Sequence, residues 1–148
     1  MAVNTDFIGR TYPPSGPYAV TADDIAAFAA AVRATDPIHT DAEAARAAGY
    51  ADVVAPPTFI VRFEQQCTRD YVADPEAGID YSRVVHGEQS FEHHRPLVAG
   101  DEITGVTSVE NIRQAGGHSM ITVKTDLAAA DGSPVCTARS TIVVRGGE

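Results

Sequence analysis

Apolar positions follow a helical spacing in the first half of the chain and a strand spacing in the second half. The first helix is expected between a capping box at Thr21 and about Arg33. A short alanine-rich helix is expected between a second capping box at Thr40 and a C-terminal cap at Gly49. A third helix is expected over residues 57–72, since proline is favoured in a first helical turn. Its predicted buried stripe consists of Ile60, Phe63, Cys67 and Tyr71.

The second half of the chain predicts antiparallel strands. They are expected at residues 83–92, 103–112, 119–127 and 136–144, with turns at 99–101, 115–117 and 130–133. Apolar and polar residues alternate along 119–127, which is the period of a half-buried strand. The Pro/Gly-rich segment 12–17 predicts a loop. Helices followed by strands predict an α+β fold in a single domain, residues 1–148, with one long helix against a curved antiparallel sheet.

The composition is that of a globular protein, and it narrows the class of partner. Of the 148 residues, 44% are hydrophobic and 21% are charged, and the formal net charge is −9. Scattered basic residues argue against nucleic acid and against an anionic membrane surface as partners. Neither a transmembrane run of about eighteen apolar residues nor a secretory signal is found. Cys67 and Cys136 fall within apolar patterns, which predicts two reduced, buried thiols in a cytoplasmic protein.

The densest chemical pattern is Asp36-Pro37-Ile38-His39, directly after the first helix. Titratable side chains in a proline-stiffened loop are candidates for a catalytic site. The competing interpretation is that Asp36 only caps the turn and that His39 is an ordinary loop histidine. His93 and His94 are adjacent, and neighbouring side chains of a strand point to opposite faces, one in and one out. No metal site is therefore predicted there, and no cofactor is expected.

Four segments of the chain carry a family resemblance. Residues 33–39, Arg-Ala-Thr-Asp-Pro-Ile-His, match the second half of a motif of the form Gly-Asp-x-Asn-Pro-Leu/Ile-His. That motif is typical of the MaoC-like family, which includes (R)-specific enoyl-CoA hydratases and (3R)-hydroxyacyl dehydratases. Residues 49–59, 84–91 and 95–101 resemble one branch of it, the small actinobacterial proteins related to the N-terminal dehydratase half. That branch includes the accessory subunits of mycobacterial type II fatty-acid dehydratases. The resemblance runs from Phe7 to Arg145.

The resemblance implies a hot-dog fold, two such domains side by side, and an acyl tunnel near their interface. In complete members an Asp and a His five residues later hold the reacting water, and a backbone N–H at the start of the central helix polarises the thioester carbonyl. Here His39 matches the histidine, but Ala34 stands in place of the aspartate and Asp36 in place of the asparagine. Pro57 replaces the glycine that donates this N–H, which leaves the Thr58 N–H as the nearest substitute.

Four hypotheses about function remain open. The favoured one is an accessory subunit of a (3R)-hydroxyacyl-thioester dehydratase or (R)-specific enoyl hydratase, paired with a MaoC-like chain that supplies the catalytic groups. The alternatives are a self-sufficient homodimeric hydratase using His39 and Asp36, a thioesterase in which Glu64 activates water, and a non-catalytic acyl-binding protein. The expected substrate is an acyl-CoA or acyl-carrier-protein thioester. The residues expected to line its tunnel are Pro57, Thr58, Phe59 and Phe63.

Overall fold

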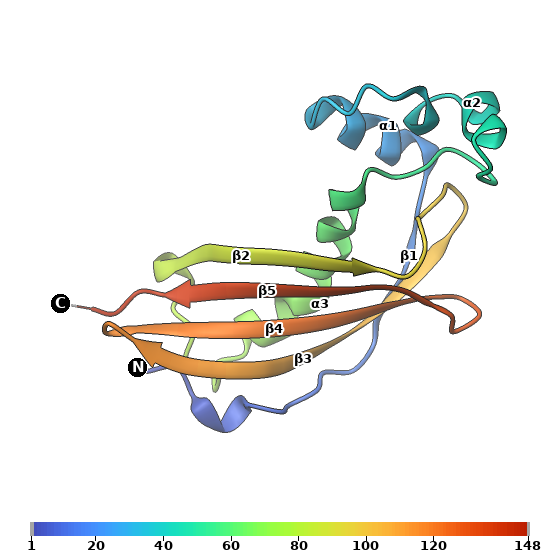
Figure 1. The fold of residues 1–148 in the computed structure, drawn as a ribbon. Helices are drawn as coiled ribbons and strands as arrows, with labels where there is room; N and C mark the ends of the chain where they lie inside the picture. Colours follow the sequence, from blue (N-terminus) through green and yellow to red (C-terminus); the bar gives the residue numbers. More distant parts are fainter. Residues whose placement is uncertain (1, 148) are drawn as a thin grey trace.

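The computed structural model describes residues 2–147 as an antiparallel sheet, a helix across one of its faces, and a layer of two shorter helices beyond one end (Figure 1). Residues 1 and 148 of the expected domain lie outside the described residues. The helices are α1 (Ala22–Ala31), α2 (Ala42–Ala47) and α3 (Val61–Ala73). The strands are β1 (Ser15–Ala19), β2 (Val84–His93), β3 (Glu102–Ala115), β4 (His118–Ala129) and β5 (Pro134–Val144). The predicted α+β class is confirmed.

The five strands form one sheet in the order β1-β3-β4-β5-β2, and every pair is antiparallel. The four strands expected from the sequence are all present, with ends shifted by up to three residues. The alternation along β4 is confirmed, because Ile121, Val123 and Leu127 are each no more than 1% exposed. β1 and β2 form the two edges of the sheet.

Strand β1 corrects the expectation that residues 12–17 form only a loop. Tyr18 pairs with Ile103 and Ala19 with Glu102, so this segment adds an edge to the sheet beside β3. Pro17 is tolerated because an edge strand has one side with no ladder hydrogen bonds to lose. Pairing with a neighbouring strand is a long-range effect, so local composition alone did not predict it.

Helix α3 crosses the sheet behind the strands in Figure 1. It follows a 3-10 turn, η3 (Pro57–Ile60), so the predicted helix 57–72 is confirmed with its first turn more tightly wound. The predicted buried stripe is also confirmed, with each of its four members at most 4% exposed. Cys67 lies directly over Gly105 of β3, where a Cβ atom would collide with the sulfur. Glycine at 105 therefore lets the helix approach the sheet.

The core has two clusters arranged along α3. The first joins Phe59, Phe63 and Cys67 to the ends of β3, β4 and β5 that lie toward α1 and α2. The second surrounds Tyr71 near the other end of the helix. Cys67 and Cys136 are free and buried, as predicted, and burial raises the pKa of each thiol to about 11.

Both short helices end in the same kind of cap. After α1, the Ala34 N–H donates to the Ala29 carbonyl and the Arg33 N–H to the Ala30 carbonyl. These two bonds form a Schellman motif, which needs a left-handed residue after the helix. Arg33 takes that role with φ 58°, as Gly49 does after α2 with φ 98°. The predicted cap at Gly49 is confirmed.

The helix starts agree with the sequence in one case and differ in the other. The Thr21 hydroxyl accepts the Asp24 N–H, as expected. At α2 the capping residue is Asp41 rather than the expected Thr40, because the Asp41 carboxylate accepts from the N–H groups of Glu43 and Ala44. Asp and Thr are both good capping residues, so adjacent candidates are hard to separate by sequence.

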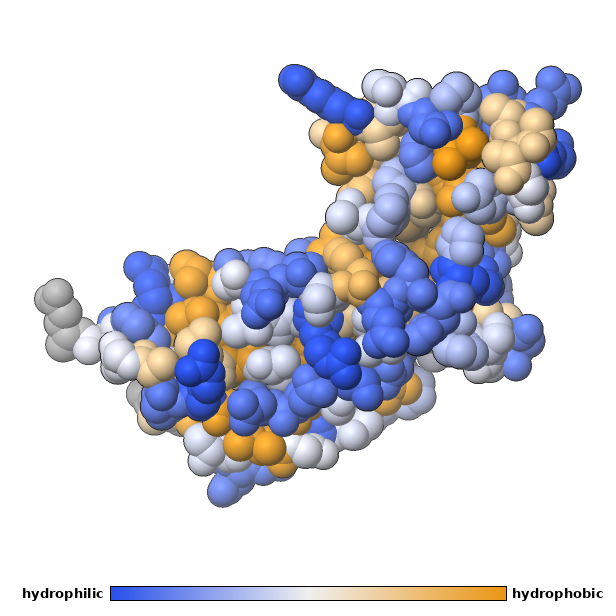
Figure 2. Space-filling view, in the orientation of Figure 1, coloured by the Kyte–Doolittle hydropathy of each residue, from blue (hydrophilic) through white to orange (hydrophobic). Residues whose placement is uncertain are grey.

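The α1–α2 layer stands off from the sheet and leaves a step between the two parts of the molecule (Figure 2). The long segment from Ala48 to Pro57 returns from this layer to α3. Among residues 2–147, no helix is long and apolar enough to cross a membrane.

Candidate active site

A short 3-10 helix, η2 (Pro37–His39), positions the motif histidine. Asp36 caps it, because its Oδ1 accepts a hydrogen bond from the Ile38 N–H at 3.1 Å. Pro37 occupies the first helical position, where its missing N–H costs nothing and its fixed φ suits the turn. The turn carries the His39 ring inward, leaving it 8% exposed.

The imidazole of His39 is held in one tautomer. Its Nδ1 lies 2.6 Å from the carbonyl oxygen of Val54, and a carbonyl only accepts, so Nδ1 carries the hydrogen. Val54 is itself fixed, because its N–H donates to the Ile38 carbonyl at 2.9 Å and it forms a β-bridge with Val98. In the neutral form of the ring, Nε2 is then the nitrogen without a hydrogen. Such a nitrogen accepts a hydrogen bond or a proton.

His39 lines a pocket of about 440 Å³, which we call the His39 pocket. The pocket lies between η2, the start of η3 and residues 93–97, so it is close to the N-terminal end of α3. Most of its lining is apolar. The apolar lining residues are Ile38, Val54, Ala55, Pro56, Pro57, Ile60, Pro96 and Leu97, and the others are His39, Tyr50, His93, His94 and Arg95.

The last residues of β2 and the residues after it form a basic side of the pocket. His93 and His94 both line it, and both are exposed. The expectation that one of them faces inward is wrong, because β2 ends at His93 and its alternation ends with it. His94 Nε2 lies 3.2 Å from the Thr137 hydroxyl, and the His93 ring packs at a tilt against Phe91.

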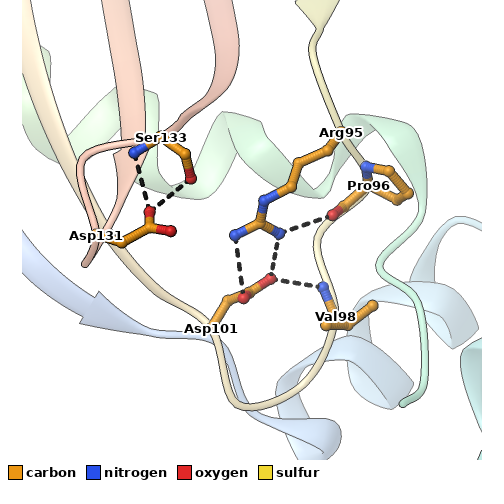
Figure 3. Close-up of polar contacts among 6 residues, drawn as sticks. All are labelled: Arg95, Pro96, Val98, Asp101, Asp131 and Ser133. Carbon is orange, nitrogen blue, oxygen red and sulfur yellow. Dashed lines mark hydrogen bonds and ion pairs between the residues drawn. The ribbon is translucent and has the colours of Figure 1, made fainter. Parts of the chain in front are cut away.

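Arg95 completes this side and is held by the loop that follows it (Figure 3). Its two terminal nitrogens donate to the two carboxylate oxygens of Asp101 at 2.9 and 3.2 Å, and one also donates to the Pro96 carbonyl at 3.1 Å. Asp101 Oδ2 in turn accepts the Val98 N–H at 2.9 Å. The hydrogen bond from Arg95 to Asp101 raises the pKa of the guanidinium. The pair therefore fixes the loop, and the charge of the guanidinium is balanced by the Asp101 carboxylate.

The family resemblance leads us to expect catalytic groups at two positions where this chain has none. Ala34 offers only a methyl group, since its N–H is used in the α1 cap. Pro57 lines the His39 pocket and has no N–H to donate. The next N–H, that of Thr58, has no acceptor within residues 2–147, as is usual in a first helical turn.

The remaining predicted site residues lie away from the pocket wall. Asp36 is exposed and its carboxylate is used as a cap. Phe59 is 0% exposed and Phe63 is 3% exposed, and their rings pack edge to face in the core. Thr58 is exposed beside Pro57. The structure thus brings together His39 and Pro57, and it adds Tyr50, which no sequence motif indicated.

A second cavity, of about 1060 Å³, runs along α3 on the side of β2 and β5, and we call it the α3–β2 groove. Glu64 of α3 lines this groove, and its side chain is buried, at 2% exposed. Burial raises the pKa of the Glu64 carboxyl, although hydrogen bonds from Ser140 and Gln89 oppose the shift. Among residues 2–147, no group of three or more His, Cys, Asp or Glu side chains is placed to hold a metal ion.

Comparison with known proteins fixes the family. Residues 6–138 match the model of the FAS1-like dehydratase domain region. The chain belongs to this dehydratase-domain family. Its relatives include proteins named UPF0336 from two actinobacteria. The one from Saccharopolyspora erythraea is 48% identical over 146 residues, which cover 99% of this chain and 94% of the relative. The one from Leifsonia xyli subsp. xyli is 51% identical over 148 residues, which cover 100% of this chain and 99% of the relative.

Solved structures of dehydratases share the fold of this FAS1-like dehydratase domain. A MaoC-like dehydratase superposes with a TM-score of 0.88 at 33% identity, covering 95% of this chain and 43% of its own length. This chain thus spans less than half of that protein. A chain of the Mycobacterium tuberculosis HadBC complex, a (3R)-hydroxyacyl-ACP dehydratase, gives a TM-score of 0.84 at 27% identity, covering 94% of this chain and 98% of the other. The expected hot-dog fold and the MaoC-like resemblance are confirmed.

Proposed function

We propose that this chain is the accessory half of a (3R)-hydroxyacyl-thioester dehydratase or (R)-specific enoyl hydratase. One observation carries the proposal: the His39 pocket keeps its histidine while both neighbouring catalytic positions, Ala34 and Pro57, lack their functional groups. Loss of one oxyanion-hole donor alone costs about a hundredfold or more in rate. A chain without that donor and without the acid is suited to hold a substrate that a second chain converts.

The His39 pocket suits the thioester end of an acyl substrate. Its walls are mostly apolar, and the side chains of His39 and Arg95 add a few polar groups to its lining. An apolar cavity with a few fixed polar groups is the usual form of a small-molecule site. We assign His39 and the start of η3, with Pro57 and Thr58, to substrate contact, and Phe59 and Phe63 to supporting that wall from the core.

The partner in this proposal is a MaoC-like chain that carries the aspartate, the histidine and the oxyanion hole. Two similar structures support pairing. The MaoC-like dehydratase is more than twice as long as the part this chain matches, and the HadBC dehydratase is named as a complex. We place the heterodimer in the cytoplasm, consistent with two free thiols in the core.

The self-sufficient hydratase is less well supported because of where Asp36 lies. Its carboxylate is exposed, caps η2, and does not line the His39 pocket. A catalytic acid must reach the reacting water, and small displacements are costly. The thioesterase alternative rests on Glu64, which lies in the α3–β2 groove and not in the His39 pocket.

The test is hydration of a short trans-2-enoyl-CoA by the purified chain alone and with a co-expressed MaoC-like chain from the same organism. The proposal predicts little activity alone and strong activity in the complex. Robust activity of the isolated chain, lost in His39→Ala, would establish the self-sufficient hydratase instead. Release of free thiol from a saturated acyl-CoA would indicate a thioesterase, and co-purified acyl lipid without turnover a binding protein.

A further inference from the structure

The acceptor that fixes the His39 ring is held in place by a loop distant in the sequence. Segment 53–55 pairs with loop 95–101 through a β-bridge between Val54 and Val98, and two backbone hydrogen bonds of 2.9 and 3.0 Å flank this bridge. The N–H of Val54 donates to η2, which only ties Val54 to the turn that carries His39 itself. The position of the Val54 carbonyl relative to the rest of the molecule is therefore set by loop 95–101.

Asp101 gives this loop its shape (Figure 3). Its Oδ2 accepts the Val98 N–H at 2.9 Å, and its own N–H donates to the Val98 carbonyl at 3.2 Å, so both backbone polar groups of the bridged residue are bonded to Asp101. Arg95 donates to both oxygens of the same carboxylate from the start of the loop. The backbone of Asp101 is anchored in turn, because its carbonyl accepts the Val20 N–H at 2.8 Å.

The strength of these contacts depends on the charge of the Asp101 carboxylate. Hydrogen bonds to an ionised acceptor are shorter and stronger than those between neutral groups. The Arg95–Asp101 pair is partly buried, so solvent weakens it less than it would a fully exposed pair. Asp101 itself is not among the residues that line the His39 pocket. Any effect of its side chain on His39 must therefore pass through the backbone.

We propose that Asp101 is a positioning residue of the His39 pocket, which keeps the His39 ring in its Nδ1–H tautomer by holding the Val54 carbonyl in place. The route runs from the Asp101 carboxylate through Val98 to Val54. This deepens the proposed function and rests on it, because there His39 contacts the substrate. The tautomer decides whether Nε2 of the neutral ring accepts or donates a hydrogen bond. If the Val54 carbonyl shifts, Nδ1–H loses its fixed acceptor and the ring populates both tautomers.

The test is the His39 tautomer in the isolated chain, read by nitrogen NMR of the isotopically labelled protein at about pH 8.5, where histidine side chains are ordinarily neutral. The His39 signals are assigned by their absence in His39→Asn. Asp101→Ala should lower the ratio of the Nδ1–H to the Nε2–H tautomer about tenfold, the usual worth of one hydrogen bond. Asp101→Asn keeps one oxygen for the Val98 N–H and should lower the ratio by less, about threefold.

Asp131→Ala is the matched control (Figure 3). Asp131 Oδ1 accepts the Ser133 N–H at 2.9 Å, the same length as the bond from Val98 to Asp101, but it caps the hairpin between β4 and β5. Both alanine variants remove a side-chain cap from a turn, so both should lower the melting temperature. Only Asp101→Ala should change the His39 tautomer. An equal fall of the tautomer ratio in both variants would overturn the proposed route.

The remaining outcomes separate this inference from the proposed function. An unchanged tautomer ratio in Asp101→Ala, or in Asp101→Asn should the alanine variant not fold, would overturn the positioning role and leave the proposed function intact. In the complex with a MaoC-like chain, Asp101→Ala should raise KM for a trans-2-enoyl-CoA and leave kcat within about tenfold. A changed tautomer with unchanged KM would overturn the link to substrate binding. An inactive wild-type complex would overturn the proposed function, while the isolated chain still decides the role of Asp101.

Discussion

At the scale of single residues, Arg33 replaces the glycine of the family motif, and this replacement costs conformational free energy in the backbone. It occupies the position of the motif glycine and keeps the left-handed backbone, φ 58°, that the cap of α1 requires. A left-handed conformation costs an ordinary residue about 1–2 kcal/mol. The helix cap therefore favours glycine at this position of the motif independently of catalysis. This chain forms the same cap without a glycine.

We therefore predict that Arg33→Gly stabilises the chain. The relief of left-handed strain exceeds the roughly 0.5–1 kcal/mol that glycine loses through its freedom in the unfolded state. The free energy of unfolding, measured by urea denaturation, should rise by about 0.5 kcal/mol. Arg33→Ala is the matched control and should give no such gain, since alanine keeps the strain. A loss of stability in Arg33→Gly would mean that the guanidinium contributes more than the backbone costs.

The raised pKa of the Glu64 carboxyl should make the stability of the chain depend on pH. Its pKa in the folded chain lies above the ordinary glutamate value of about 4.3, so the folded state favours the protonated form. The stability that the protonated carboxyl contributes is fully present below the ordinary glutamate pKa. It is lost as pH rises through the pKa of the folded state. The difference in melting temperature between Glu64→Met and the wild type should therefore widen as pH rises from 4 to 7. A constant difference over that range would mean that Glu64 titrates normally in the folded chain.

At the scale of secondary-structure elements, the contact between α3 and β3 depends on a glycine. A Cβ at position 105 would collide with the Cys67 sulfur and approach the Leu127 side chain to 3.2 Å. We predict that Gly105→Ala lowers the free energy of unfolding by about 1–3 kcal/mol through overpacking. In the double variant with Cys67→Ala, the loss should be smaller than the sum of the two single losses. If the two losses were strictly additive in denaturation measurements, the added Cβ at position 105 and the Cys67 sulfur would not be in strained contact.

The elements also show what the sequence could predict. The amphipathic helix 57–72 and the alternating strand 119–127 were predicted because each is defined by its own periodicity. Strand β1 was not, since its identity comes from pairing with β3, far along the chain. The cap at Asp41 was missed by one residue, because two good capping residues are adjacent.

At the scale of the whole molecule, the candidate site was only partly predictable. His39 and Pro57, which the motif singled out, both line the His39 pocket, and Asp36 caps η2, as one of the two interpretations of the motif expected. Tyr50 at the pocket, and Glu64 as a buried carboxyl, depend on how distant segments pack. No local pattern signals such packing, because a helical carboxylate is usually solvated.

Under the proposed function, this chain is the substrate-holding half of a two-chain enzyme. The most direct test compares two variants of the reconstituted complex: His39→Ala in this chain, and alanine at the motif histidine of the MaoC-like partner. Hydration of a trans-2-enoyl-CoA should be abolished by the partner's substitution. His39→Ala should mainly raise KM and leave kcat within about tenfold, because the group binds substrate without moving a proton. Loss of kcat in His39→Ala, with activity surviving the partner's substitution, would contradict the account and make this chain the catalytic half.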